Sequence, residues 1–239
     1  MSTRTASQAR RSRKPARLSL ECLERREVKA GNVQAWVDAS GTLNVVGDGA
    51  SNGVQITQVS STSYTVSGLY QYGATGINGF SSRTFSNVRT DIAVNLGNGD
   101  DYLAIGGTTA GGRARLDDDL RIVMGAGHDT VDIWALTNRD DNDYMSIDTG
   151  SGDDRVNLFN VSCNAGLEVK TGSGNDRLTM GNSAAGWMYA DLGTGNDQAD
   201  VRNSWFASLS AVEGGSGFDT GLFRSNSSTL RVRGFESFR

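Results

Sequence analysis

The sequence has few of the residues that build zinc centres and disulfide frameworks. Of its 239 residues, one is proline, one is histidine and two are cysteine. A zinc site of the usual His/Cys type and a disulfide-stapled scaffold are therefore excluded. No run approaches the roughly 20 apolar residues that cross a bilayer, and the N-terminus lacks the apolar core of a cleavable signal peptide. The sequence predicts no transmembrane segment.

Basic residues are scarce beyond residue 30. Residues 1–30 carry nine Lys and Arg against three Glu, which leaves 14 basic and 24 acidic residues in 31–239 and a net charge of −10 there. An acidic body argues against nucleic acid as a partner and favours cations. We therefore expect no nucleic-acid binding.

The chain divides into three segments by composition. Residues 1–30 form a basic leader, predicted to be disordered up to about residue 17 and then disordered or a short helix. Residues 31–90 alternate polar and apolar positions, with strands expected over 42–46, 54–59 and 63–66. We interpret this part as an N-terminal β cap with a first coil, and residues 91–239 as a repeat region.

An internal repeat dominates the second half. The pattern Gly-x-Gly-x-Asp occurs six times, with spacings of 28, 25, 22, 21 and 22 residues between the first glycines. Alternating apolar residues flank each copy, which is typical of a strand, a tight turn and a second strand. The copies are residues 97–101, 125–129, 150–154, 172–176, 193–197 and 215–219. A second corner carries Asn160, Asn182 and Asn203, with Asn226 one residue further along, and predicts a hydrogen-bonded asparagine ladder.

The repeat predicts an all-β fold, a parallel β-helix or β-solenoid with about 22 residues per coil. One unit cannot bury its apolar face alone, but units stacked in register bury it as a continuous core. An antiparallel sandwich needs no fixed period. A β-roll of nine-residue motifs would repeat the turn every nine or eighteen residues, so the longer spacing favours the helix.

The repeated aspartates are candidate calcium ligands. Stacked about 4.8 Å apart, neighbouring carboxylates repel by roughly 0.9 kcal/mol in water and about 3.5 kcal/mol at an effective dielectric of 20. Calcium removes that cost, since carboxylate and carbonyl oxygens are the hard ligands it prefers. Gly-Asn-Asp turns also occur purely as structural punctuation, because Asn and Asp tolerate tight turns. The predicted calcium-binding residues are Gly97, Gly99, Asp101, Gly125, Gly127, Asp129, Gly150, Gly152, Asp153, Asp154, Gly172, Gly174, Asp176, Gly193, Gly195, Asp197, Gly217 and Asp219.

Two positions are expected to weaken this column. His128 follows Gly127, and Phe218 follows Gly217, where other copies carry Asp or Asn. Each replaces an oxygen that could serve calcium. The sites at Gly125 and Gly215 are therefore predicted to be the weakest.

The six turns resemble the glycine-rich nonapeptide repeat of RTX (hemolysin-type) calcium-binding proteins, Gly-Gly-x-Gly-x-Asp-x-apolar-x. The resemblance covers about residues 92–225, and its second and third glycines and its Asp match in every copy. It implies calcium held between stacked turns by the Asp and by backbone carbonyls. The first glycine matches only at Gly214; the other copies carry Leu96, Met124, Thr149, Thr171 and Leu192.

Residues 16–30, ARLSLECLERREVKA, resemble the N-terminal LEPR-XLL-like motif of bacterial surface and exported proteins. That resemblance implies a sorting segment outside the fold and an extracellular or cell-surface location.

Three functions follow as hypotheses. The first is a secreted or surface-displayed calcium-binding repeat protein with a structural or adhesive, non-enzymatic role, whose partners include extracellular polysaccharide or cell-envelope components. The second is a pectate-lyase-like enzyme acting on polysaccharide, with off-pattern charges as candidates: Arg113, Arg115, Arg139, Asp140, Asp141 and Asp143. The third is a metal-independent structural spacer.

Overall fold

The computed structural model describes residues 31–71, 74–108, 111–138 and 142–238. These residues form 21 β-strands and no helix, which confirms the predicted all-β fold. The described part of the chain accordingly contains no helix able to cross a membrane. The leader, with its LEPR-XLL-like motif, lies outside the described residues.

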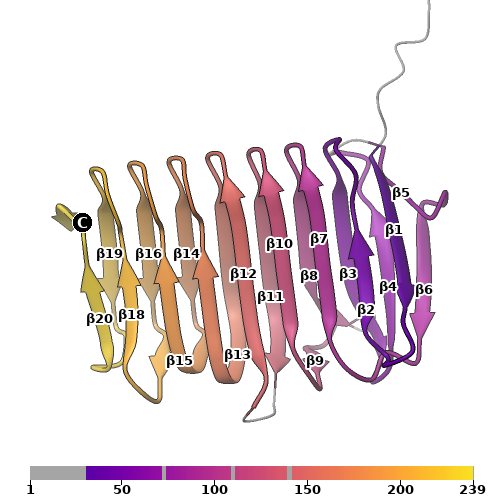
Figure 1. Cartoon of the computed structure of the whole chain (residues 1–239). Coiled ribbons are helices and arrows are strands. Elements are labelled where there is room, and N and C mark those ends of the chain that lie inside the picture. Colours follow the sequence, from indigo (N-terminus) through magenta and orange to yellow (C-terminus); the bar gives the residue numbers. More distant parts are fainter. Residues whose placement is uncertain (1–30, 72–73, 109–110, 139–141, 239) are drawn as a thin grey trace, which may run out of the picture.

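Two faces of parallel strands run along the molecule, joined by the Gly-x-Gly-x-Asp turns (Figure 1). One face consists of the strands that precede these turns and of the strands paired with them at the two ends. These are β2 (Leu43–Val46), β7 (Ile92–Asn98), β10 (Leu120–Ala126), β12 (Tyr144–Ser151), the second half of β13 (Arg155–Lys170), β15 (Ala184–Asp191), β18 (Ser210–Glu213) and β20 (Leu230–Arg233). Strands of the other face are β3 (Gly53–Ser60), β8 (Tyr102–Thr108), β11 (Thr130–Asn138), the first half of β13, β14 (Arg177–Gly181), β16 (Gln198–Arg202), β19 (Thr220–Arg224) and β21 (Ser237–Phe238).

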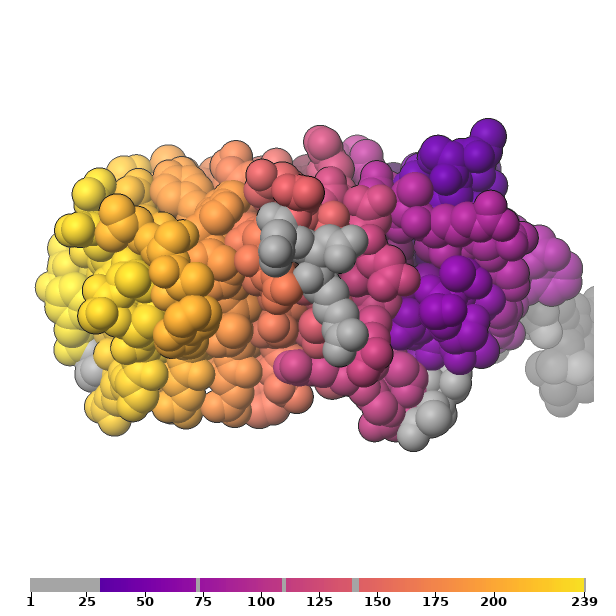
Figure 2. Space-filling view, turned by 90° about the horizontal axis from the view of Figure 1, so that it is seen from below, coloured from indigo at the N-terminus to yellow at the C-terminus, as the bar shows by residue number. Residues whose placement is uncertain are grey.

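The register of these strands equals the spacing of the sequence repeat. Ile122 on β10 lies between Val94 on β7 and Ile147 on β12, so each residue stacks on the equivalent residue of the next coil. Seen from the edge opposite to the tight turns, the colours from β7 onward follow chain order along the body, one coil after another (Figure 2). Because like stacks on like, any property repeated in the sequence becomes a column in space.

The core consists of the apolar positions that flank each turn. Apolar residues before and after the turns are buried in successive coils, for example Ile122, Val131 and Ile133 at 0–1% exposure. At the C-terminal end, Phe223 is half-buried and packs edge-on against Phe235, with ring centroids 5.3 Å apart. The alternation of the sequence therefore specifies which side of each strand faces inward.

The corner opposite to the tight turns needs left-handed backbone. Asn160, Asn182 and Asn203 have φ angles of 57°, 50° and 51°, a conformation that asparagine tolerates. Ser225, with φ of 55°, takes the equivalent place in the last coil, and Asn226 lies one residue further along, as the sequence indicated. The predicted asparagine ladder is wrong: among the described hydrogen bonds, none joins these side chains to one another. Short strands β9 (Ala114–Leu116) and β17 (Trp205–Phe206) extend this corner.

The N-terminal part departs from parallel stacking. The expected strands are present as β2, β3 and β4 (Ser63–Gly68), but β3 pairs antiparallel with β4, and β4 with β6 (Ser82–Ser86). β1 (Asn32–Val37) forms an antiparallel pair with β2 and a parallel one with β5 (Gly76–Ile77). At the same time β2 and β3 pair in parallel with β7 and β8 at an offset of 49 residues. The turn between β2 and β3 thus belongs to the same stack as the six repeated turns.

Candidate metal centre

The six repeated turns share one backbone shape, which only glycine permits. The φ angle lies between 89° and 111° at the first glycine and between 117° and 143° at the second. The coils also approach closely: a Cβ on Gly125 would lie 1.7 Å from the carbonyl oxygen of Gly97. These glycines therefore fix the turn that points the following aspartate into the body.

The aspartates after these turns form one buried column. Each is at most 2% exposed, and each one from Asp129 onward accepts a hydrogen bond at Oδ1 from the backbone N–H of the aspartate one coil earlier. The Asp101 N–H, for example, donates to Asp129 Oδ1 at 2.7 Å. The structure thus brings all six predicted aspartates together as an inner column: Asp101, Asp129, Asp154, Asp176, Asp197 and Asp219.

The inner column has two end members that the motif search missed. Asn52, in the turn between β2 and β3, is fully buried and donates its N–H to Asp101 Oδ1 at 2.7 Å. At the other end the Asp219 N–H donates to Glu236 Oε2 at 2.7 Å. The 49-residue offset between Asn52 and Asp101 equals that of the β2–β7 and β3–β8 pairings, a register that no repeated motif of the sequence marks.

A second ladder runs along the outside of the same turns. Here the side chain of one coil accepts the backbone N–H of the next coil, which is the reverse of the direction in the inner column. His128 N–H donates to Asp100 Oδ1, and Asp153 N–H donates to His128 Nδ1, each at 2.8 Å. His128 therefore takes the acceptor role of an oxygen. This outer ladder consists of Asp100, His128, Asp153, Asn175 and Asn196 and ends at Phe218, whose N–H is the last donor.

The inner column leaves one oxygen per aspartate without a partner. In all six, Oδ2 is buried and has no hydrogen bond among the described residues. Burial, followed by smaller effects that include the charge of neighbouring aspartates, raises the pKa of five of these carboxyls from the ordinary value of 3.8. The pKa is raised to about 7 at Asp101, Asp129 and Asp197 and to about 6 at Asp176, and it is raised at Asp154 as well. At neutral pH, protons or a bound cation would offset the cost of burying these charges.

The backbone carbonyls of the turns are largely engaged. The carbonyl of Gly150 accepts the N–H of Ser173, and the carbonyl of Ser173 accepts the N–H of Gly152. The same two bonds recur in the following coils. Among the oxygens that the RTX resemblance assigns to calcium, the aspartate Oδ2 atoms are the buried side-chain oxygens without a hydrogen bond among the described residues.

The residue before the first glycine decides what lies beside each carboxylate. A Cβ on Gly214 would lie 2.6 Å from Asp219 Oδ2, so this position adjoins the carboxylate directly. By the same register, buried Thr149 and Thr171 adjoin Asp154 and Asp176; the other three coils place Leu96, Met124 and Leu192 there. The donor set fits a hard cation best at Asp154 and Asp176, where a hydroxyl replaces an apolar side chain, and at Asp219, where Gly214 places no side chain beside the carboxylate.

A separate acidic group lies at the opposite corner. Asp91, Asp118 and Asp119 have carboxylate oxygens within 4.8 Å of one another and are half-buried. Asp91 Oδ1 accepts the Asp119 N–H at 3.3 Å, and Asp119 Oδ1 accepts the Tyr144 N–H at 2.6 Å. These bonds join the starts of neighbouring coils, so the group helps to hold the coils together. Sequence reasoning missed it because the three residues lie in no repeated motif.

The residues proposed for polysaccharide chemistry are partly outside the described structure. Residues 139–141 are not described, and Asp143 is buried at 7% exposure. The Arg113 guanidinium donates to the carbonyl and side-chain oxygens of Asn160, at 2.5 and 2.6 Å. Arg115 contributes its backbone N–H to Gln58 Oε1. The described part of this group therefore makes structural contacts across coils.

Comparison of the chain with protein-family models, curated proteins and solved structures found no match. The functional argument accordingly rests on the geometry of the turns.

Proposed function

We propose that the chain is a calcium-binding repeat protein of the RTX-like kind, with a structural or adhesive, non-enzymatic role outside the cell or on its surface. One observation carries the proposal: six successive aspartates present a buried Oδ2 without a hydrogen-bond partner. Leaving a buried acceptor unsatisfied costs about 1–3 kcal/mol, more when it is charged. Such a cost repeated in every coil favours a bound counter-charge over simple turn formation.

Asp154, Asp176 and Asp219 would hold the cation, with the hydroxyls of Thr149 and Thr171 as additional oxygens. Bound calcium would supply positive charge and complete the contacts of the Oδ2 atoms. The chain itself supplies the frame, since Oδ1 of each aspartate fixes the carboxylate against the preceding coil. The cation then stabilises the folded chain by mass action.

The proposed location rests on the LEPR-XLL-like segment and on calcium supply. Residues 16–30 resemble the sorting segment of bacterial surface and exported proteins. Sites built from one carboxylate per coil suit the millimolar calcium of extracellular modules. Metal-dependent folding would let the chain reach its stable form after export.

Thermal melting of the full chain tests this proposal. Melting is recorded at pH 7.5 in EDTA, in millimolar calcium and in millimolar magnesium. We expect a calcium-specific rise in Tm that Asp176→Asn reduces and that Asp148→Asn, an exposed carboxylate on β12, leaves unchanged. Identical melting curves in EDTA and calcium would instead support the metal-independent spacer.

A further inference from the structure

The outer face of the second set of strands carries a cluster of arginines on an otherwise acidic body. Arg155 on β13 is paired in register with Arg177 on β14, and Arg202 on β16 with Arg224 on β19. All four are exposed. Like charges on directly neighbouring strands are destabilising. Their stacking here, against a body charge of −10, points to an anionic partner.

Few carboxylates oppose these cations. Among the described salt bridges, only Arg202 has a partner on this face, Asp200, whose two oxygens it binds at 2.5 Å each. Arg155, Arg177 and Arg224 form none of the described salt bridges. The outward-facing positions of β14, β16, β19 and the first half of β13 thus carry four arginines and one carboxylate.

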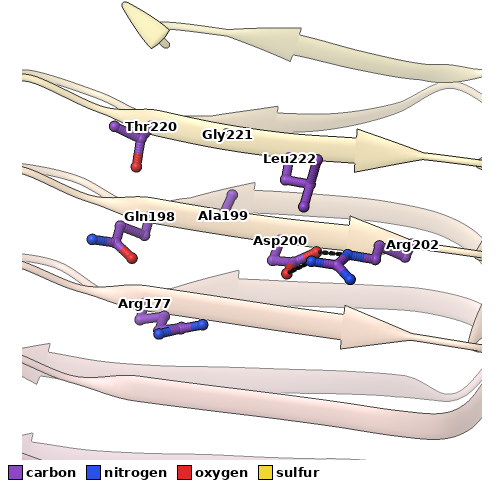
Figure 3. Close-up of a pocket in the computed structure, with 8 residues that line it drawn as sticks. All are labelled: Arg177, Gln198, Ala199, Asp200, Arg202, Thr220, Gly221 and Leu222. Atoms are coloured by element: carbon purple, nitrogen blue, oxygen red, sulfur yellow. Dashed lines mark hydrogen bonds and ion pairs between the residues drawn. The ribbon is translucent and has the colours of Figure 1, made fainter. Parts of the chain in front are cut away.

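Two of these arginines, Arg177 and Arg202, line a hollow on this face. A hollow of about 260 Å³ lies between Arg177 and Arg202, with Gln198 and Thr220 on its walls. Figure 3 shows Arg177 and Arg202 extending toward each other from opposite ends of neighbouring strands, with Asp200 between them. A second hollow, of about 210 Å³, shares Asp200 and Arg202. We call these two hollows and the four arginines the arginine groove.

An exposed aromatic ring lines the second hollow. Phe159 is 57% exposed and pairs in register with Gly181, whose missing side chain opens the space beside the ring. A Cβ on Gly181 would lie 3.4 Å from Phe159 Cδ2. Asn157 and Thr179 add polar groups at the rim. A flat apolar face beside polar side chains suits the C–H face of a pyranose ring better than an extended peptide.

We propose that the arginine groove binds an acidic polysaccharide rich in uronate residues. Carboxylates of the polymer match the planar fork of the unpaired guanidinium groups, and one sugar ring lies on Phe159. The coil-to-coil repeat of arginines along the groove suits a polymer with regularly spaced charges. This site shares no residue with the inner aspartate column, so it goes beyond the calcium proposal and does not depend on it.

Titration calorimetry of the full chain with a galacturonate hexamer, in EDTA, tests this proposal. The matched neutral ligand is a galactose hexamer. We expect binding of the acidic hexamer only, weakened about tenfold by Arg177→Gln, as expected for the loss of one charge-assisted pair. Arg121→Gln, an exposed arginine on β10 of the opposite face, should leave binding unchanged.

Phe159 separates a saccharide site from a plain cationic surface. Phe159→Ala is expected to weaken the acidic hexamer, and Phe159→Trp to restore it, with melting curves recorded to show that both variants fold. Absence of binding by the acidic hexamer would overturn the proposal. Equal binding of single-stranded DNA with the same dependence on Arg177 would also overturn it. Because EDTA is present throughout, failure here and failure of the calcium proposal are distinguishable.

Discussion

The inner column and the outer ladder make the same hydrogen bond with different residues. In both, a side chain accepts a backbone N–H from the neighbouring coil, at 2.7–2.8 Å in the inner column and 2.7–3.0 Å in the outer ladder. The outer ladder uses Asp, Asn or His for this purpose. The inner column uses aspartate in every one of six coils, although the place is buried and raises the pKa of the carboxyl.

The comparison separates what stacking requires from what stacking does not explain. A neutral acceptor suffices to join two coils, as Asn175 does for Asn196. Six buried carboxylates therefore have a further use, which we assign to cation binding. Experiments that neutralise one ladder and spare the other test this assignment.

The largest effect is expected from neutralising the inner column. Asp154→Asn combined with Asp176→Asn and Asp219→Asn keeps an acceptor oxygen in each coil and removes three charges. We expect the calcium-induced rise in Tm to disappear, because the oxygens assigned to calcium are gone. In EDTA the variant should melt at or above the wild-type temperature, since each removed neighbour repulsion is worth up to about 3.5 kcal/mol at an effective dielectric of 20. A full calcium response in this variant would refute the assignment.

Acid should stabilise the metal-free chain. The folded pKa values of about 7 at Asp101, Asp129 and Asp197 lie above the ordinary value of 3.8. The protonated carboxyls therefore contribute stability that is fully present below pH 3.8 and is lost as the pH rises through about 7. Urea unfolding in EDTA should give a lower midpoint at pH 8 than at pH 5.5, and calcium should remove most of the difference. A midpoint that rises from pH 5.5 to pH 8 in EDTA would contradict this prediction.

Asn52→Asp lengthens the inner column by one charge. The substitution loses the Asn52 amide bond to the Ala50 carbonyl at 2.6 Å and places a carboxylate beside Asp101. We expect destabilisation of about 1–3 kcal/mol in EDTA at pH 8, measured by urea unfolding, and a smaller loss at pH 5.5. Equal losses at both pH values would mean that the lost amide bond, rather than the added charge, dominates.

The smallest effect is expected from the outer ladder. Asp100→Asn with Asp153→Asn leaves both acceptor oxygens in place on exposed side chains. We expect a change in the free energy of unfolding within about 0.5 kcal/mol per site, as for ordinary surface substitutions, and an unchanged calcium response. Loss of that response would indicate that the cation binds on the outer side of the turns rather than at the inner column.

Much of the fold follows from the repeat, because stacking copies a sequence period into space. The six aspartates and the apolar residues such as Ile122 and Val131 lie where alternation and spacing placed them. Alternation cannot tell parallel from antiparallel pairing, so β4 and β6 could not be assigned from the pattern. The direction of the hydrogen bonds, which makes His128 an acceptor, also has no sequence signal.

The ends of the inner column were missed for a similar reason. Asn52 follows a turn whose glycines do not align with those of the repeat: the register places Asp48 opposite Gly97. Glu236 reaches the column from a longer side chain near the C-terminal strand, outside any repeated turn. A repeated motif reveals only copies of itself. The column, however, can be continued by any polar side chain that reaches the hydrogen-bonding position of the next coil.

The most direct test is a count of calcium ions bound to the full chain by native mass spectrometry at pH 7.5. The account predicts bound calcium in the wild-type chain and in the Asp100→Asn/Asp153→Asn variant. It predicts loss of that calcium in the Asp154→Asn/Asp176→Asn/Asp219→Asn variant. Equal calcium in all three chains, or none in the wild type, would contradict it.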